Sequence, residues 1–167
     1  MIRFGILFAV IVVALFAAEL TPPVQHALVI PWTEGLARVS AGLVTVFDPQ
    51  VVSHGRILQS TRNGFAVSIE AGCNGIEAAL ILIAAMLAFP APWKYRLAGI
   101  LAGLVAVQAL NVVRVVSLFY LGQWHAGAFE WAHLYLWQAL IMLDVLVVWL
   151  VWVRALPRPP GRVSHAE

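Results

Sequence analysis

The chain has 167 residues, of which 62% are hydrophobic and only 11% are charged, and its mean hydropathy is +0.91. This composition exceeds what the core of a water-soluble domain requires and predicts a single integral membrane domain. The net charge of +2 comes from scattered basic residues rather than from a basic block, which argues against nucleic-acid binding. The seven tryptophans are typical of side chains that anchor a protein at the lipid bilayer interface.

Four apolar stretches predict an all-α polytopic membrane protein over residues 1–155. A membrane-spanning helix needs roughly 20 apolar residues, and the stretches that approach this length are residues 4–19, 71–90, 97–121 and 134–153. The first stretch fits a cleavable signal peptide as well as a retained anchor, and we expect a retained anchor. Proline, glycine or charged residues separate each stretch from the next.

The basic residues near the ends of these stretches predict the orientation. In a four-span topology all of them fall on one side of the membrane, namely Arg3, Lys94, Arg96, Arg154, Arg158 and Arg162. The positive-inside rule assigns that side to the cytoplasm. Residues 20–70 and 122–133 are therefore expected to face the periplasm or exterior, and residues 156–167 are expected to form a disordered cytoplasmic tail.

The outer segment, residues 20–70, contains two further patterns. Residues 32–47 place apolar side chains at helical spacing, which predicts an amphipathic helix at the interface or against the bundle. Residues 56–60 and 64–70 alternate apolar and polar side chains on either side of a turn that contains Asn63-Gly64. Asn-Gly is a strong signal for a tight turn, so we expect a β-hairpin that leads directly to the second span.

The only cysteine, Cys73, lies where this polar segment meets the second predicted span. It cannot form a disulfide within the chain, and a lone free cysteine is commonly a small buried hydrophobic residue. A nucleophile is the competing interpretation, because a nearby cation or a helix N-terminus favours the reactive thiolate. Arg114, near the outer end of the third span, and His133, at the start of the fourth, are expected on the same side.

These residue types suit nucleophilic chemistry. His133 can accept the proton of Cys73 and later donate it to a leaving amine, because imidazole titrates near neutral pH. Arg114 can orient a scissile carbonyl or stabilise an oxyanion. An arginine within a span costs about 2.5 kcal/mol or more at mid-helix, so it needs a partner. We expect that partner to be Glu77, one turn after Cys73, with Asp144 as the competing candidate.

Each of these residues also has a purely structural interpretation. Arg114 paired with an acidic residue can simply fix helix register, and His133 can anchor the chain at the interface. His125 and His54 are interpreted as ordinary loop histidines. We expect no metal or other cofactor, because the spacing of His125, Glu130 and His133 matches no standard set of ligands.

Three motifs together resemble the exosortase and archaeosortase family, in a form similar to the compact exosortase H type. They are Cys73-Asn74-Gly75-Ile76 at the start of a span, Asn111-Val-Val-Arg114 near the outer end of the next, and His133 at the start of the last. The resemblance covers about residues 55–153. The chain departs from larger members in having fewer spans and in having Asn74 where serine is frequent.

The resemblance implies a membrane cysteine protease and transpeptidase. Its substrates would be exported proteins that end in a short recognition motif, a hydrophobic helix and a basic cluster. Cys73 would be the nucleophile that forms a thioester, Arg114 would stabilise the carbonyl or oxyanion, and His133 would be the general acid and base. Glu77, Asn74 and Asn111 are candidate supporting residues.

A non-enzymatic function is the alternative interpretation. In a membrane assembly or transport subunit, Glu77, Arg114 and Asp144 would provide polar contacts within the membrane. Loss of activity on substitution of Cys73 distinguishes the enzyme from such a subunit.

Overall fold

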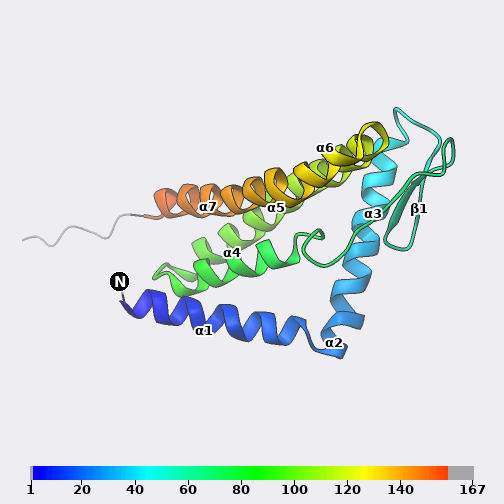
Figure 1. The fold of residues 1–167 in the computed structure, drawn as a ribbon. Coiled ribbons are helices and arrows are strands. Elements are labelled where there is room, and N and C mark those ends of the chain that lie inside the picture. The colour runs from blue at the N-terminus through cyan, green and yellow to red at the C-terminus, as the bar shows by residue number, and fades with distance from the viewer. Residues whose placement is uncertain (1, 158–167) are drawn as a thin grey trace, which may run out of the picture.

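The computed structural model describes residues 2–157 and is mostly helical (Figure 1). Three of the described helices are long and apolar enough to cross a membrane, namely Ile2–Glu19, Trp93–Trp124 and the continuous helix Ala126–Ala155. A shorter apolar helix, Ile76–Ala88, accompanies them. The protein is thus a multi-pass membrane protein, as predicted. Residues 158–167 of the predicted tail lie outside the described residues.

The membrane helices pack side by side. Helix α1 (Ile2–Glu19) packs along α4 (Ile76–Ala88), and α4 also contacts α5 (Trp93–Trp124) and α7 (Trp137–Ala155) (Figure 1). Between α4, α5 and α7 lies a buried apolar core that includes Leu82, Met86, Val107, Ile141 and Val145. These contacts hold the ends of α4, α5 and α7 at fixed positions relative to one another.

Helix α4 is shorter than the predicted span 71–90. It has 13 residues, which at 1.5 Å per residue gives roughly 20 Å, less than the roughly 30 Å hydrocarbon core of a bilayer. The helix begins at Ile76 because residues 71–75 form an irregular turn, in which Gly72 and Gly75 have φ angles of 81° and 74°. The helices around the other predicted spans are longer than predicted, and they begin and end at the residues given above.

The outer segment begins with helical turns that cross the end of the bundle. Helix α2 (Pro22–Val24) and the π-helical segment η1 (Gln25–Val29) lead into α3 (Ile30–Val44), which lies across the bundle helices in Figure 1. The predicted helix 32–47 therefore exists, with a start two residues earlier and an end at Val44. The difference at the start arises because Pro31 lies in the first turn of α3, where its missing N–H costs no hydrogen bond.

The β-hairpin is confirmed as part of a larger sheet. Strands β1 (Val51–His54), β2 (Ile57–Ser60) and β3 (Ala66–Ser68) form an antiparallel sheet in the order β1-β2-β3. The predicted hairpin corresponds to β2 and β3, in which Leu58 faces Val67. Strand β1 was not predicted, because Val51-Val52-Ser53-His54 does not alternate apolar and polar residues.

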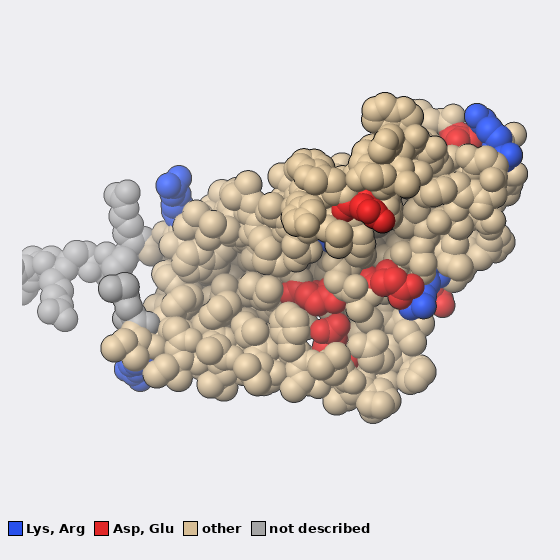
Figure 2. Space-filling model, in the orientation of Figure 1, with Lys and Arg blue, Asp and Glu red and all other residues tan. Residues whose placement is uncertain are grey.

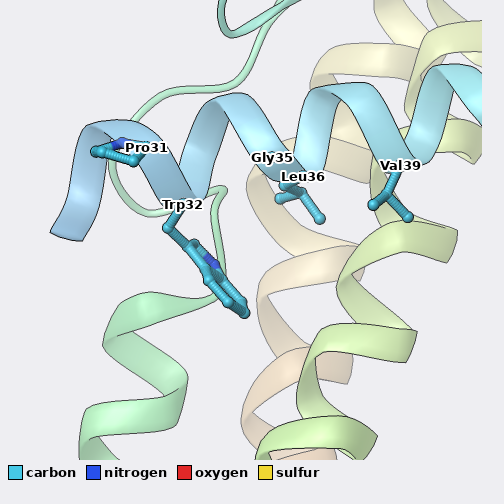
Figure 3. Close-up of a pocket in the computed structure, with 5 residues that line it drawn as sticks. All are labelled: Pro31, Trp32, Gly35, Leu36 and Val39. Atoms are coloured by element: carbon cyan, nitrogen blue, oxygen red, sulfur yellow. The ribbon is translucent and has the colours of Figure 1, made fainter.

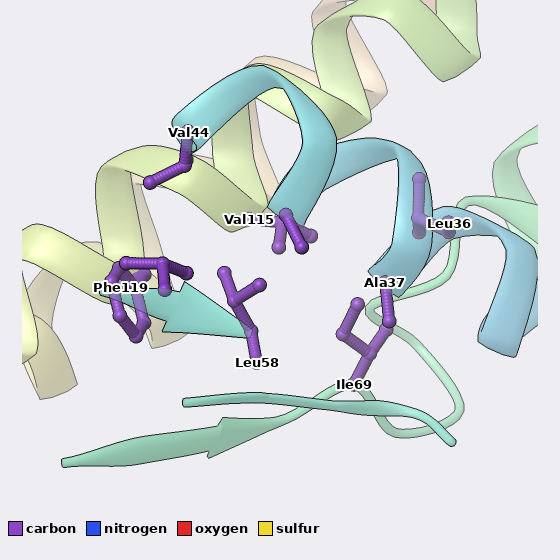
Figure 4. Packing of buried hydrophobic residues seen from close by; sticks show 9 residues of the cluster. Leu36, Ala37, Val44, Leu58, Ile69, Val115 and Phe119 are labelled. Atoms are coloured by element: carbon purple, nitrogen blue, oxygen red, sulfur yellow. The ribbon is translucent and has the colours of Figure 1, made fainter. Parts of the chain in front are cut away.

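A second apolar core joins α3, the sheet and α5. Buried members of this core, shown in Figure 4, are Leu36, Ala37, Val44, Leu58, Ile69, Val115 and Phe119. Ile69 lies just after β3, and Val115 follows Arg114 on α5. This core therefore fixes the segment that carries Cys73 against the part of α5 that carries Arg114.

Basic side chains in the terminal turns of α1, α5 and α7 lie at the end of the bundle away from the sheet (Figure 1). Arg3 is in the first turn of α1, Lys94 and Arg96 are in the first turn of α5, and Arg154 is in the last turn of α7. In Figure 1 these helix ends lie together, opposite α3 and β1. Acidic side chains instead gather on the visible face near the junction of the bundle with the outer segment (Figure 2).

Candidate active site

Cys73 lies in the turn between β3 and α4. Its backbone N–H donates to the carbonyl of Glu70 at 2.9 Å, and the positive φ angles of Gly72 and Gly75 bend the chain on either side. The turn lies directly on α5, because a Cβ atom at Gly75 would be 2.7 Å from the Gln108 amide nitrogen. That nitrogen donates to the Gly75 carbonyl at 3.2 Å. Glycine is therefore required at position 75 for both conformation and space.

Asn74 joins this turn to two helices. Its side-chain oxygen accepts from the N–H of Ile76, the first residue of α4, at 3.0 Å, and its amide nitrogen donates to Thr33 Oγ1 at 3.2 Å. The Trp32 indole donates to the Asn74 carbonyl at 3.3 Å. Trp32 also lines an apolar groove of ≈ 250 Å³ on α3, where Trp32, Leu36 and Val39 point toward the bundle helices (Figure 3). Asn74 is thus a positioning residue for the turn.

The structure brings the three predicted catalytic side chains together. Cys73 Sγ lies 3.0 Å from His133 Nε2. Arg114 Nη2 donates to the same sulfur at 3.3 Å, and Arg114 Nη1 donates to the Gly72 carbonyl at 3.1 Å. Arg114 is only 3% exposed. One guanidinium therefore contacts both the thiol and the backbone just before it.

His133 comes from an irregular part of the last membrane helix. It lies in the π-helical segment η2 (Ala132–Leu136), between α6 (Ala126–Trp131) and α7. π-helical turns alter the direction in which side chains leave a helix and are frequent at functional sites. The imidazole packs against Phe129, with ring centroids 5.6 Å apart. His125 has a different role, because its Nδ1 accepts from the N–H of Ala128 at 3.1 Å and caps α6.

The prediction that Glu77 forms an ion pair with Arg114 is wrong. Glu77 Oε1 accepts from the Gly72 N–H at 2.6 Å, and the described residues contain no ion pair between Arg114 and an acidic side chain. Asp144 does not replace Glu77, since its buried Oδ2 has no hydrogen-bond partner among the described residues. The turn explains the difference: it presents the Gly72 N–H to Glu77 and the Gly72 carbonyl to Arg114.

Asn111 lies one turn before Arg114 on α5 and is fully buried. A Cβ atom at Gly75 would be 3.1 Å from its amide nitrogen, so the side chain lies against the Cys73 turn. Neither of its amide atoms has a hydrogen-bond partner among the described residues. Of the predicted supporting residues, Glu77 hydrogen-bonds to the turn, Asn74 is part of the turn and bonds to Ile76 and Thr33, and Asn111 packs against it.

A small cavity of ≈ 70 Å³ opens beside the thiol. Its walls are the end of β3 and the following linker, α5, and the start of the last membrane helix; they include Val67, Ser68, Glu70, Cys73, Arg114, Phe129 and His133. Neither Phe129 nor Glu70 was predicted to be part of the site. Phe129 lies four residues before His133, the helical spacing that could have indicated their contact.

The surroundings of Cys73 keep its thiol protonated at neutral pH. Burial raises the pKa of the thiol, and the negative charges of Glu77 and Glu70 raise it further. Arg114 acts in the opposite direction but does not reverse the effect of burial. A base is therefore needed to form the thiolate, and the His133 imidazole nitrogen is in direct contact with the sulfur.

The pH dependence of alkylation tests this protonation state. We expect the rate at which iodoacetamide modifies Cys73 to keep rising with pH beyond about 8.5, the pKa of a free thiol. Substitution Arg114→Gln should move the midpoint higher still, because it removes the charge that favours the thiolate. The modified fraction is measured by mass spectrometry across a pH series. A wild-type midpoint below about 8.5 would contradict the expectation.

The fold and the site define a multi-pass membrane protein with a cysteine–histidine–arginine cluster at one end of its helical bundle. The chain belongs to the transmembrane exosortase family, because the family model described as Transmembrane exosortase (Exosortase_EpsH) matches residues 2–153. The resemblance seen in the sequence motifs is thereby confirmed, and it extends over nearly the whole chain. Searches of curated proteins and of solved structures found no match.

Proposed function

We propose that this protein is a membrane-embedded cysteine protease and transpeptidase that cleaves C-terminal sorting signals of exported proteins through a thioester on Cys73. The observation that carries the proposal is the position of one sulfur, 3.0 Å from His133 Nε2 and 3.3 Å from Arg114 Nη2. Membership of the exosortase family supports it independently. A buried arginine that donates to a thiol suits a site where negative charge develops.

The first half of the reaction forms the thioester. The Cys73 thiol transfers its proton to His133 Nε2, and the resulting thiolate attacks the scissile carbonyl of the substrate. Arg114 stabilises the negative charge on sulfur and then the charge on the tetrahedral oxyanion. When this intermediate collapses, the carbon–nitrogen bond breaks, and the leaving amine takes the proton from His133.

The second half releases the product. An amine or a water molecule attacks the thioester carbonyl while His133 accepts its proton. The carbon–sulfur bond then breaks, and His133 returns the proton to Cys73. Transfer to an amine gives a new amide, and attack by water gives a carboxylic acid.

The distribution of charge supports a site at the outer face of a bacterial inner membrane. Arg3, Lys94, Arg96 and Arg154 lie at helix ends opposite the Cys73 turn (Figure 1). Under the positive-inside rule these ends are cytoplasmic, as is the C-terminus of α7. A substrate whose basic cluster stays in the cytoplasm would then present its recognition motif at the level of Cys73.

The contacts of Arg114 favour the enzyme over an assembly or transport subunit. Polar pairing within the membrane would require Arg114 to contact Glu77 or Asp144. Its two hydrogen bonds instead go to Cys73 Sγ and to the Gly72 carbonyl. We therefore propose a catalytic role for this arginine.

A reporter assay tests the proposed function. The reporter is a secreted domain fused to the C-terminal motif, hydrophobic helix and basic cluster of an exported protein encoded in the same genome. It is co-expressed with the full chain, and cleavage is followed by the change in reporter mass on a gel. Cleavage that depends on Cys73 supports the proposal, whereas cleavage by a Cys73→Ala variant refutes it.

The two histidines near the site give a matched comparison in this assay. We expect His133→Ala to slow cleavage by about 10²–10⁴-fold, the usual contribution of general acid–base catalysis. His125→Ala should cleave at close to the wild-type rate, because His125 caps α6 and does not contact the thiol. An active His133→Ala variant together with an inactive His125→Ala variant would reverse the assignment.

A further inference from the structure

Strand β3 forms one edge of the sheet, and the register shows which of its backbone groups are free. The N–H of Ser60 donates to the Phe65 carbonyl at 2.9 Å, and the N–H of Ile69 donates to the Arg56 carbonyl at 3.0 Å. In an antiparallel pair, hydrogen-bonded positions alternate with positions that point away from the partner strand. The N–H and C=O groups of Ala66 and Ser68 therefore point away from β2 toward the free edge.

This free edge borders the cavity that contains the thiol. Ser68 lines the same ≈ 70 Å³ cavity as Cys73, Arg114 and His133. Ala66 and Ser68 are both exposed, and no described residue hydrogen-bonds to their outward backbone groups. The side chain of Ser68 is engaged elsewhere, because its hydroxyl donates to Glu70 Oε1 at 2.8 Å.

The opposite edge of the sheet, strand β1, does not border the cavity that contains the thiol. Strand β1 packs against α3 and lies two strands away from the Cys73 turn. The N–H of Thr61 donates to the Gln50 carbonyl, so every second residue from Gln50 bonds to β2, including Val52 and His54. Ser53 lies between them, and its N–H therefore points away from β2. Ser53 is thus the counterpart of Ser68 at an edge that does not border the thiol.

We propose that the free edge of β3 binds the recognition segment of the substrate as an added β-strand, which leads the scissile carbonyl to Cys73. This inference rests on the proposed function and names how the same site recognises its substrate. A cavity of ≈ 70 Å³ is too small for a helix about 10 Å across. An added strand needs only the spacing of about 4.8 Å between paired strands. Main-chain hydrogen bonds would supply affinity, and the cavity walls would supply side-chain selectivity.

Proline substitutions test the role of the edge. Ser68→Pro removes one outward N–H without removing a hydrogen bond between β2 and β3, and edge strands tolerate proline at such positions. We expect it to slow reporter cleavage by about tenfold or more, the effect of one lost hydrogen bond with added steric conflict. Ser53→Pro is the matched control, since both serines follow a valine within an edge strand. Ser53→Pro should cleave at close to the wild-type rate. Ser68→Ala separates the hydroxyl from the backbone, because it keeps the outward N–H, and it should cleave faster than Ser68→Pro.

The rate of Cys73 alkylation by iodoacetamide shows whether each variant keeps an intact site. If Ser68→Pro changes that rate, Ala66→Pro replaces it, because Ala66 is the other residue with an outward N–H and is farther along the chain from Cys73. Loss of cleavage with unchanged alkylation supports the edge. If the proline variant at the β3 edge cleaves the reporter at the wild-type rate, the β3 edge does not bind the substrate. The proposed function still stands in that case, provided that Cys73→Ala is inactive. Cleavage by Cys73→Ala overturns both.

Discussion

Substitution of Cys73 by alanine or serine is expected to abolish reporter cleavage, with a loss on the order of 10⁶-fold, typical for removal of a catalytic nucleophile. Alanine offers no nucleophile. Serine keeps an oxygen near His133 Nε2, but its hydroxyl is far less acidic than a thiol, and a site that contacts a large, polarisable sulfur will not activate it equally. Cleavage of the co-expressed reporter, followed over time, measures the loss.

The serine variant also controls for folding. A hydroxyl can retain the contacts that Arg114 and His133 make to the sulfur, so Cys73→Ser should unfold at nearly the wild-type temperature in detergent. A variant that is folded and inactive assigns the loss to chemistry. Cleavage at even one hundredth of the wild-type rate by a folded Cys73→Ala variant would remove Cys73 from the mechanism.

Substitution Arg114→Lys is expected to reduce cleavage by about 10²–10³-fold, the usual effect of removing one donor to a developing oxyanion. The guanidinium reaches Cys73 Sγ and the Gly72 carbonyl with two separate nitrogens. An ammonium group is a single point of charge and lacks this planar fork. Reporter cleavage measures the loss, and the pH series for Cys73 alkylation shows whether the positive charge beside the thiol is retained.

Arg96→Lys is the matched control for this substitution. Arg96 also donates to a backbone carbonyl, that of Phe89 at 3.0 Å, but it lies at the opposite end of α5. The Arg96→Lys variant should therefore cleave the reporter at close to the wild-type rate. Equal activity of the Arg114→Lys and Arg96→Lys variants would show that charge alone suffices at position 114, or that Arg114 takes no part in the reaction.

The grouping of Cys73, Arg114 and His133 could be predicted because it depends on order along the chain. Each residue lies near an end of an apolar stretch, and alternation of direction between successive helices brings those ends together. The position of the hairpin turn was likewise predictable, since Asn63-Gly64 is a local turn signal. Features of this kind need no knowledge of how side chains pack.

The partner of Arg114 could not be predicted in the same way. Its acceptor is a backbone carbonyl, that of Gly72, and the direction of this carbonyl depends on a φ angle of 81° that no residue pattern specifies uniquely. The π-helical segment at His133 also could not be predicted, because a search for regular α-helical spacing does not detect a π-helical turn. Opposite charge therefore suggested Glu77 as the partner of Arg114. In the folded turn Glu77 instead accepts from the Gly72 N–H, and Arg114 donates to the Gly72 carbonyl.

Mass spectrometry of Cys73 during turnover tests the thioester most directly. The purified full chain is mixed with the reporter, quenched in acid after a short interval and digested. We expect the peptide that contains Cys73 to carry the carboxyl end of the reporter's N-terminal fragment, through a bond that hydroxylamine releases. Reporter cleavage with Cys73 unmodified at every interval, and with no species sensitive to hydroxylamine, would contradict the mechanism.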